Sequence, residues 1–194
     1  MSEPITAAEA AEFLRLDGAS DSPTPELALM NRLIEAARVA AENFMNRSVT
    51  AGTRTLVLDD FTSRDSGVVS STIPLPFGDV STVDSISYVD DDGATQTVSS
   101  HILSENQLTP AFGETWPSTR SQIGAVTITY TAGYADINSP AENGTPKPIV
   151  QAMYLILDGM YEVREETAQG AVGAYHVNPV VERLLMPYHI DMGI

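Results

Sequence analysis

The sequence predicts an α+β fold, with a mainly helical core of two long helices plus short ones, a small antiparallel β meander and a flexible C-terminal tail. In two long stretches, near residues 25–46 and 148–164, apolar residues recur with the period of a helix. Between these stretches, short runs alternate apolar and hydroxyl residues, as strands do. We expect one domain over residues 1–164, and a flexible linker with a short C-terminal segment over residues 165–194.

Start signals precede each predicted helix. Thr6 is followed three residues later by Glu9, a capping-box pattern that predicts a short first helix. Thr24-Pro25-Glu26 offers a cap, a proline suited to the first helical position and an acid near the positive end of the helix dipole. Pro148 opens the third helix, and its broad apolar face predicts packing against the second helix.

Two segments predict strands. Residues 83–89 and 94–98 flank Asp90-Asp91-Asp92-Gly93, and we expect a β-hairpin in which Asp-Gly supplies the positive φ angles of a primed turn. Residues 126–131 alternate apolar residues with threonines, which predicts a strand with one apolar and one threonine face. A short strand is also expected at residues 56–58, and polar composition predicts loops at residues 59–72 and 135–147.

Charge and composition exclude several classes of protein. The chain has 26 acidic and 10 basic residues, and a net charge of -16 has the wrong sign for neutralising DNA phosphates. It contains no cysteine, so thiol catalysis, thiolate metal sites and disulfides are excluded. Gln151 and Asp158 interrupt the most apolar stretch, and the N-terminus lacks the pattern of a signal peptide. We therefore expect neither membrane insertion nor secretion.

No motif predicts catalysis, a metal or a cofactor. The aspartates of residues 90–92 resemble the start of a calcium loop, but no glutamate follows at the twelfth position. His101, His176 and His189 are too far apart in sequence to form a local metal motif. The chain also lacks a nucleophile elbow and a phosphate-binding glycine loop.

The order of several sequence segments resembles the phage head-tail connector (neck adaptor) family. These segments span nearly the whole chain: ITAAEAAEFLR at 5–15, LIEAAR at 33–38, AENF at 41–44, WP at 116–117, VTITYTAGY at 126–134, PIVQAM at 148–153, YEVRE at 161–165 and LLMPY at 184–188. His189 departs from the family pattern, in which arginine often stands after this last segment. A salt bridge of that arginine is therefore not expected here.

The resemblance implies a structural protein of a virion neck, assembled in the host cytoplasm, in a phage or in a gene transfer agent. Its partners would be further copies of itself in a ring, typically dodecameric, together with the portal protein and a stopper or tail-completion protein. DNA would pass through the lumen without specific binding. The family carries no catalytic residues and no cofactor.

Two groups of residues are candidate contact sites. A glycine-rich stretch precedes an apolar cluster that we expect to dock on the portal or on a neighbouring subunit, although the cluster could instead fold back onto its own core. Aromatic residues near loops could be lids of the core or interface anchors. The docking candidates are Val180, Val181, Leu184, Leu185 and Tyr188, and the aromatic candidates are Phe112, Trp116 and Tyr134.

Two other classes compete with this interpretation. A DNA-packaging factor such as a small terminase subunit would also form rings, but it should carry a basic recognition helix, and none is evident. A lytic enzyme would need a positioned acid–base pair. Glu165-Glu166 is the sequence's only adjacent glutamate pair, and it lies at a predicted helix end.

Overall fold

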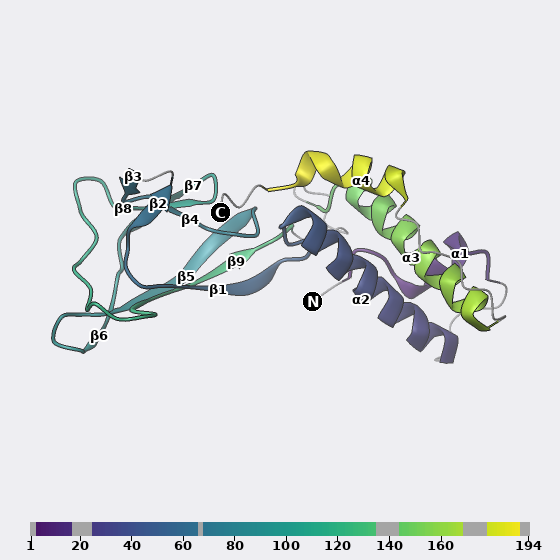
Figure 1. The fold of residues 1–194 in the computed structure, drawn as a ribbon, viewed down its shortest axis with the longest axis horizontal. Coiled ribbons are helices and arrows are strands. Elements are labelled where there is room, and N and C mark those ends of the chain that lie inside the picture. Colours follow the sequence, from purple (N-terminus) through teal and green to yellow (C-terminus); the bar gives the residue numbers. More distant parts are fainter. Residues whose placement is uncertain (1–2, 17–24, 66–67, 135–143, 169–177, 191–194) are drawn as a thin grey trace. The chain divides into compact units, whose positions relative to one another are not determined.

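The computed structural model describes residues 3–16, 25–65, 68–134, 144–168 and 178–190, and it divides into two compact units (Figure 1). The helical unit comprises Met1–Thr50 and Tyr134–His189, and the sheet unit comprises Ala51–Gly133 and Ile190–Ile194. These boundaries differ from the expected division at residue 164, because the C-terminal helix packs against the other helices. The predicted glycine-rich linker lies mostly at residues 169–177, outside the described residues.

The helical unit contains α1 (Ala7–Phe13), α2 (Pro25–Met45), α3 (Lys147–Ala168), α4 (Pro179–Leu185) and a 3₁₀ turn, η1 (Met186–Tyr188). The predicted capping box is confirmed at α1. The Thr6 hydroxyl accepts from the backbone N–H of Glu9 at 3.2 Å, while the Glu9 carboxylate accepts from the N–H of Thr6 at 2.8 Å. The Glu9 carboxylate also accepts from the Thr6 hydroxyl at 2.7 Å, and the bonds that it accepts from the N–H and the hydroxyl of Thr6 lower the pKa of Glu9. The short helix therefore begins where the sequence predicts.

The core of the helical unit lies between α2 and α3, which confirms their predicted packing. Alanines at the contact allow two helices to approach closely. Tyr154 of α3 stacks on Phe13 at 4.8 Å and joins α1 to this core. Burial, together with the charges of Glu9 and Glu12, raises the pKa of Tyr154. The buried residues at the α2–α3 contact include Met30, Ile34, Ala37, Ala41 and Met45 from α2, with Ile149, Ala152, Met153, Ile156 and Leu157 from α3.

The sheet unit is built from three antiparallel arrangements of strands. A four-stranded sheet has the order β1 (Gly52–Leu58), β9 (Val126–Ala132), β5 (Val80–Val89) and β6 (Thr95–Thr97). A three-stranded sheet has the order β4 (Ile73–Pro74), β8 (Gln107–Pro110) and β7 (His101–Ser104). The strands β2 (Ser63–Asp65) and β3 (Val68–Ser70) form a ribbon.

The prediction of a mainly helical core with a small meander was wrong, because the sheet unit has a hydrophobic core of its own. Strands of two to four residues are too short to show the alternation that identifies a strand. The predicted loop at 59–72, for example, contains β2 and β3. The buried members of this second core are Phe61, Ile73, Leu75, Ile86, Leu108, Val126, Ile128, Tyr130 and Ala132.

The predicted hairpin is present between β5 and β6, but its turn differs from the expected type. A type I′ turn, the primed type that Asp-Gly favours, needs positive φ at both central residues, whereas in this loop only Gly93 has it, at +86°. The longer loop is closed instead by Asp90, whose carboxylate accepts from the N–H of Ala94 at 2.8 Å. The primed geometry occurs at the two-residue connection of β7 and β8, where Glu105 and Asn106 have φ values of +48° and +65°.

No described helix is long and apolar enough to cross a membrane.

Candidate docking surfaces

The C-terminal segment predicted to dock on a partner packs in part against its own subunit. Asn178 caps α4 by accepting from the N–H of Val180 at 3.0 Å, and Pro179 occupies the first turn. One side of the helix is buried, with Val181 exposed by 8% and Leu185 by 1%. The other side presents Val180, exposed by 49%, and the adjoining turn presents Met186, exposed by 66%. Among the other predicted docking residues, Leu184 and Tyr188 are half-buried.

Arg47 joins the end of α2 to the C-terminal segment. Its Nε donates to the carbonyl oxygen of Tyr188 at 3.0 Å, and another guanidinium nitrogen donates to the Tyr134 hydroxyl at 3.3 Å. The guanidinium also lies 5.9 Å from the centre of the Tyr134 ring. His189, which follows Tyr188, packs edge-on against Phe44, with 6.2 Å between the ring centres. At the position where the family often has arginine, this chain therefore has a histidine that makes an aromatic contact.

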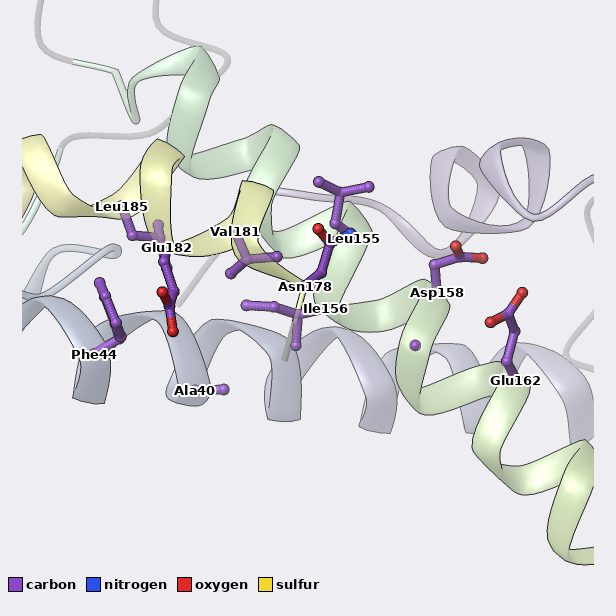
Figure 2. A pocket seen from close by; sticks show the side chains of 11 residues that line it. Ala40, Phe44, Leu155, Ile156, Asp158, Glu162, Asn178, Val181, Glu182 and Leu185 are labelled. Carbon is purple, nitrogen blue, oxygen red and sulfur yellow. The ribbon is translucent and has the colours of Figure 1, made fainter. Parts of the chain in front are cut away.

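A groove of about 290 Å³ lies among α2, α3 and α4 (Figure 2). Phe44, Ile156 and Leu185 supply apolar walls. Acidic side chains stand at both ends of the groove: Asp158 and Glu162 from α3 at one end, and Glu182 from α4 at the other. This rim suits a partner segment that combines apolar and basic residues.

The three candidate aromatics fall into two groups. Trp116 is half-buried, stacks on Phe61 at 4.8 Å and donates from Nε1 to the carbonyl oxygen of Ser71 at 2.6 Å, so it is a lid of the sheet core. Tyr134 packs on the helical core and binds Arg47. Phe112, in contrast, is 99% exposed, which is the environment of an interface anchor rather than a core residue.

Sequence reasoning missed further exposed apolar residues. Ile123 is 92% exposed and Val57 is 57% exposed, although both are β-branched residues of a kind usually buried. Val57 lies on the exposed face of β1, where the other side chains are those of Thr53 and Thr55. This alternation with threonines was the sequence signal that could have predicted an exposed valine.

Among the basic residues whose side chains the structure describes, Arg38, Arg47 and Arg54 make contacts inside the units. Arg38 forms ion pairs with Glu3 and Glu42, each at 2.9 Å. Desolvation lowers the pKa of Arg38, but the hydrogen bond to Glu3 and the charges of Glu42, Glu3 and Glu35 outweigh it and raise the pKa overall. Arg47 holds the C-terminal segment, and Arg54 lies 4.6 Å above the Phe77 ring. These arginines serve packing, which leaves fewer cations for a nucleic-acid surface.

Chemical sites are not assembled among the described residues. No three histidine, aspartate or glutamate side chains gather there in a way that could hold a metal. The aspartates near Gly93 form the hairpin turn, and His101 and His189 lie in different units. His176 and the side chains of Glu165 and Glu166 lie outside the described residues.

No protein-family model and no curated protein sequence matches this chain. Solved structures do match it. A chain in the neck of an empty gene transfer agent particle, computed with C6 symmetry, has a TM-score of 0.69 and 24% identity, covering 97% of this chain and 92% of its own length. A chain in the virion of a native gene transfer agent particle has a TM-score of 0.70 and 25% identity, with coverages of 96% and 89%.

A chain in the neck of a native gene transfer agent particle, computed with C12 symmetry, has a TM-score of 0.65 and 25% identity, with coverages of 97% and 92%. These neighbours are structural components of particles and not enzymes, and they do not favour the terminase alternative. The chain therefore shares its fold, over almost its full length, with neck proteins of gene transfer agents, which confirms the predicted resemblance to the head-tail connector family.

Proposed function

We propose that this chain is a structural head-tail connector subunit, which forms a ring in the neck of a phage or phage-like particle. The observation that carries the proposal is the match of both units to neck chains of gene transfer agents over 96–97% of the sequence. Two of those structures were computed with C6 and C12 symmetry, which supports a ring of copies and is compatible with twelve. Assembly would take place in the host cytoplasm, before the subunit becomes part of the virion neck.

The charge of the chain suits a conduit through which DNA passes. A ring of subunits that each carry a formal charge of -16 repels the DNA phosphates instead of binding them. Near-surface charges act over a Debye length of roughly 8 Å at physiological salt, so the repulsion operates only at short range. DNA would therefore slide through the lumen without specific binding.

The C-terminal segment is our candidate for docking on the portal. Its buried residues, Val181 and Leu185, hold α4 on the subunit, and this leaves Val180 of α4 and Met186 of the adjoining turn η1 exposed. A rigid apolar ridge loses less entropy on binding than a tethered tail does. The groove beside α4 has an acidic rim, which favours a portal segment with basic and apolar residues as its partner. A stopper or tail-completion protein would bind elsewhere on the ring.

The test combines the purified full-length chain with the portal protein of the same particle. Negative-stain images and the mass of the complex should show a ring of the chain on the portal. Val180→Asp and Met186→Asp should weaken portal binding at least tenfold with unchanged melting temperatures, since both side chains are exposed. Glu105→Gln, on an exposed turn of the sheet unit, is the control and should bind normally.

Three outcomes would contradict the proposal or a part of it. A chain that neither forms rings nor binds the portal would not be a connector. Normal portal binding by both aspartate variants would reject α4 as the docking site while leaving the connector function in place. Retention on a DNA column at moderate salt, with no ring, would favour a packaging factor.

A further inference from the structure

The outer face of the four-stranded sheet carries hydroxyl side chains in register. Residues directly opposite each other on antiparallel strands share a face of the sheet. The other side of the same strands holds Leu56, Ile128 and Ile86 toward the sheet core. Three rows cross β1, β9 and β5 on the outer side: Thr53, Thr131 and Thr82; Thr55, Thr129 and Ser85; and Val57, Thr127 and Ser87. We call these nine residues the hydroxyl face, and none of them is charged.

Two irregularities in β5 add polar groups beside these rows. The register shifts skip Ser81 and Asp84, which are the extra residues of β-bulges. The Asp84 carboxylate accepts from the hydroxyls of Thr131 at 3.2 Å and Thr82 at 3.1 Å. This carboxylate is thus hydrogen-bonded within the sheet.

Exposed apolar side chains lie at one end of the hydroxyl face. A Cβ added to Gly124 would come within 3.3 Å of Val57 Cγ1, so the segment that carries Ile123 runs directly beside β1. The N–H of Gly124 donates to the Asp59 carboxylate at 2.9 Å, which fixes the segment there. Val57 and Ile123 are 57% and 92% exposed, so two apolar side chains on adjoining segments are left uncovered in the single subunit.

We propose that the hydroxyl face and Ile123 are covered by a neighbouring copy of the same chain in the ring. This inference rests on the proposed function, because it assumes that copies assemble. Adjacent copies that each carry a formal charge of -16 repel one another, so their contact should use the least charged surface available. The centres of protein interfaces are likewise depleted of charged residues.

The chemistry of the hydroxyl face fits this neighbour. Each hydroxyl can both donate and accept, so it can pair with whichever polar group the neighbour presents. The carboxylate beside these rows, Asp84, would enter the contact already hydrogen-bonded to Thr82 and Thr131. A ring closed by rotation joins two different patches of each subunit. The hydroxyl face would supply one patch, and a surface outside it would supply the other. The neighbour would lose contact with Val57 and Ile123 if either were made polar.

A charge placed on this face tests the proposal. Thr55→Glu introduces a carboxylate at an exposed position of the edge strand β1, where it touches no core residue. Gln107→Glu makes the same change in charge at an exposed position of β8, in the other sheet, and serves as the matched control. Ile123→Ser removes the apolar contact without adding charge. The full-length proteins are compared by mass measurement, alone and on the portal, after melting curves confirm folding.

We expect Thr55→Glu to reduce ring formation at least tenfold and Ile123→Ser to reduce it severalfold, whereas Gln107→Glu should assemble like the parent chain. The absence of cysteine allows a second measurement, in which Thr55→Cys should react with a maleimide several times more slowly in the ring than in the monomer. Normal rings from Thr55→Glu, or equal labelling in ring and monomer, would overturn this inference alone. A parent chain that forms no ring even with portal would instead overturn the proposed function.

Discussion

The Nε of Arg47 donates to the main-chain carbonyl of Tyr188, which lies 141 residues further along the chain, and this bond holds the C-terminal segment on the end of α2. A hydrogen bond from a charged donor contributes about 1.5–3 kcal/mol when its partner is partly buried. Arg47→Lys keeps the charge but loses the planar donor geometry and the contact with Tyr134. We expect the free energy of unfolding to fall by about 1–2 kcal/mol.

Hydrogen exchange should locate this effect, because amide protection should drop mainly at residues 178–190. Arg32→Lys, at an exposed position of α2, provides the control and should change neither measurement. Unaltered protection in the Arg47 variant would mean that Val181 and Leu185 hold the segment without help from the arginine.

The α2–α3 interface should respond unequally to truncation of its side chains. Ile156 is 7% exposed, so Ile156→Ala should cost about 2–4 kcal/mol through lost burial and a residual cavity. Leu33 is only half-buried, and Leu33→Ala should cost about 1–2 kcal/mol. Val39→Ala, at a position that is 41% exposed, should stay within about 0.5 kcal/mol of the parent. Chemical denaturation measures all three, and equal costs at Ile156 and Val39 would disprove the packing.

Asn106 combines a strained backbone with a side-chain bond that can be separated by mutation. Its φ of +65° favours glycine over alanine, and its side-chain oxygen accepts from the N–H of Val80 at 2.8 Å. Asn106→Gly loses only the side-chain bond and should destabilise by about 1 kcal/mol. Asn106→Ala loses the bond and adds strain, so its melting temperature should be lower than that of the glycine variant. The reverse order would show that the positive φ costs alanine less than the greater freedom of the unfolded chain costs glycine.

Tyr130 should make stability fall at alkaline pH. Burial raises its pKa to about 12, although the charge of Arg54 acts in the opposite direction. The neutral phenol is favoured in the folded state, so its contribution is complete below the ordinary pKa of 10 and is lost as pH rises from 10 to 12. Absorbance at 295 nm should show Tyr130 titrating late, and Tyr154, whose pKa is also raised, should titrate above the ordinary value as well.

Tyr130→Phe provides the comparison for this titration. The variant loses the hydroxyl's hydrogen bond to the carbonyl oxygen of Pro76, 3.1 Å long, and should be less stable at neutral pH by about 1 kcal/mol. Its stability should, however, decline less than that of the parent between pH 10 and 12. Parallel declines in both proteins would assign the alkaline sensitivity to another group.

Local signals in the sequence identified the elements that local chemistry defines. The capping box at Thr6 and Glu9, the stripe of α2 and the alternation of β9 all lie within short windows, and the structure contains each of them. Strands β7 and β8 were missed because Leu108 is buried only after β8 pairs with β4, more than thirty residues away. Their pairing depends on remote contacts, which periodicity does not report.

The candidate site was predicted in part for a similar reason. The apolar cluster at the C-terminus was visible in the sequence, but which of its members face the subunit depends on the rotation of α4. Val180 and Val181 are adjacent and chemically identical, yet only Val181 is buried. The sequence likewise showed a threonine face on β9, while its continuation over β1 and β5 depends on their register.

The pairing of Gly52 with Ala132 also bears on how this protein could change over evolution. The chain leaves the helical unit just before Gly52 and returns to it just after Ala132, so the sheet unit is an insertion whose two ends are neighbouring strands. Paired strands are only about 5 Å apart, a distance that one or two residues can bridge. Evolution could therefore lengthen, shorten or exchange the sheet unit without moving the ends of α2 and α3. The surface of the sheet unit could also diverge while the helical unit keeps its sequence.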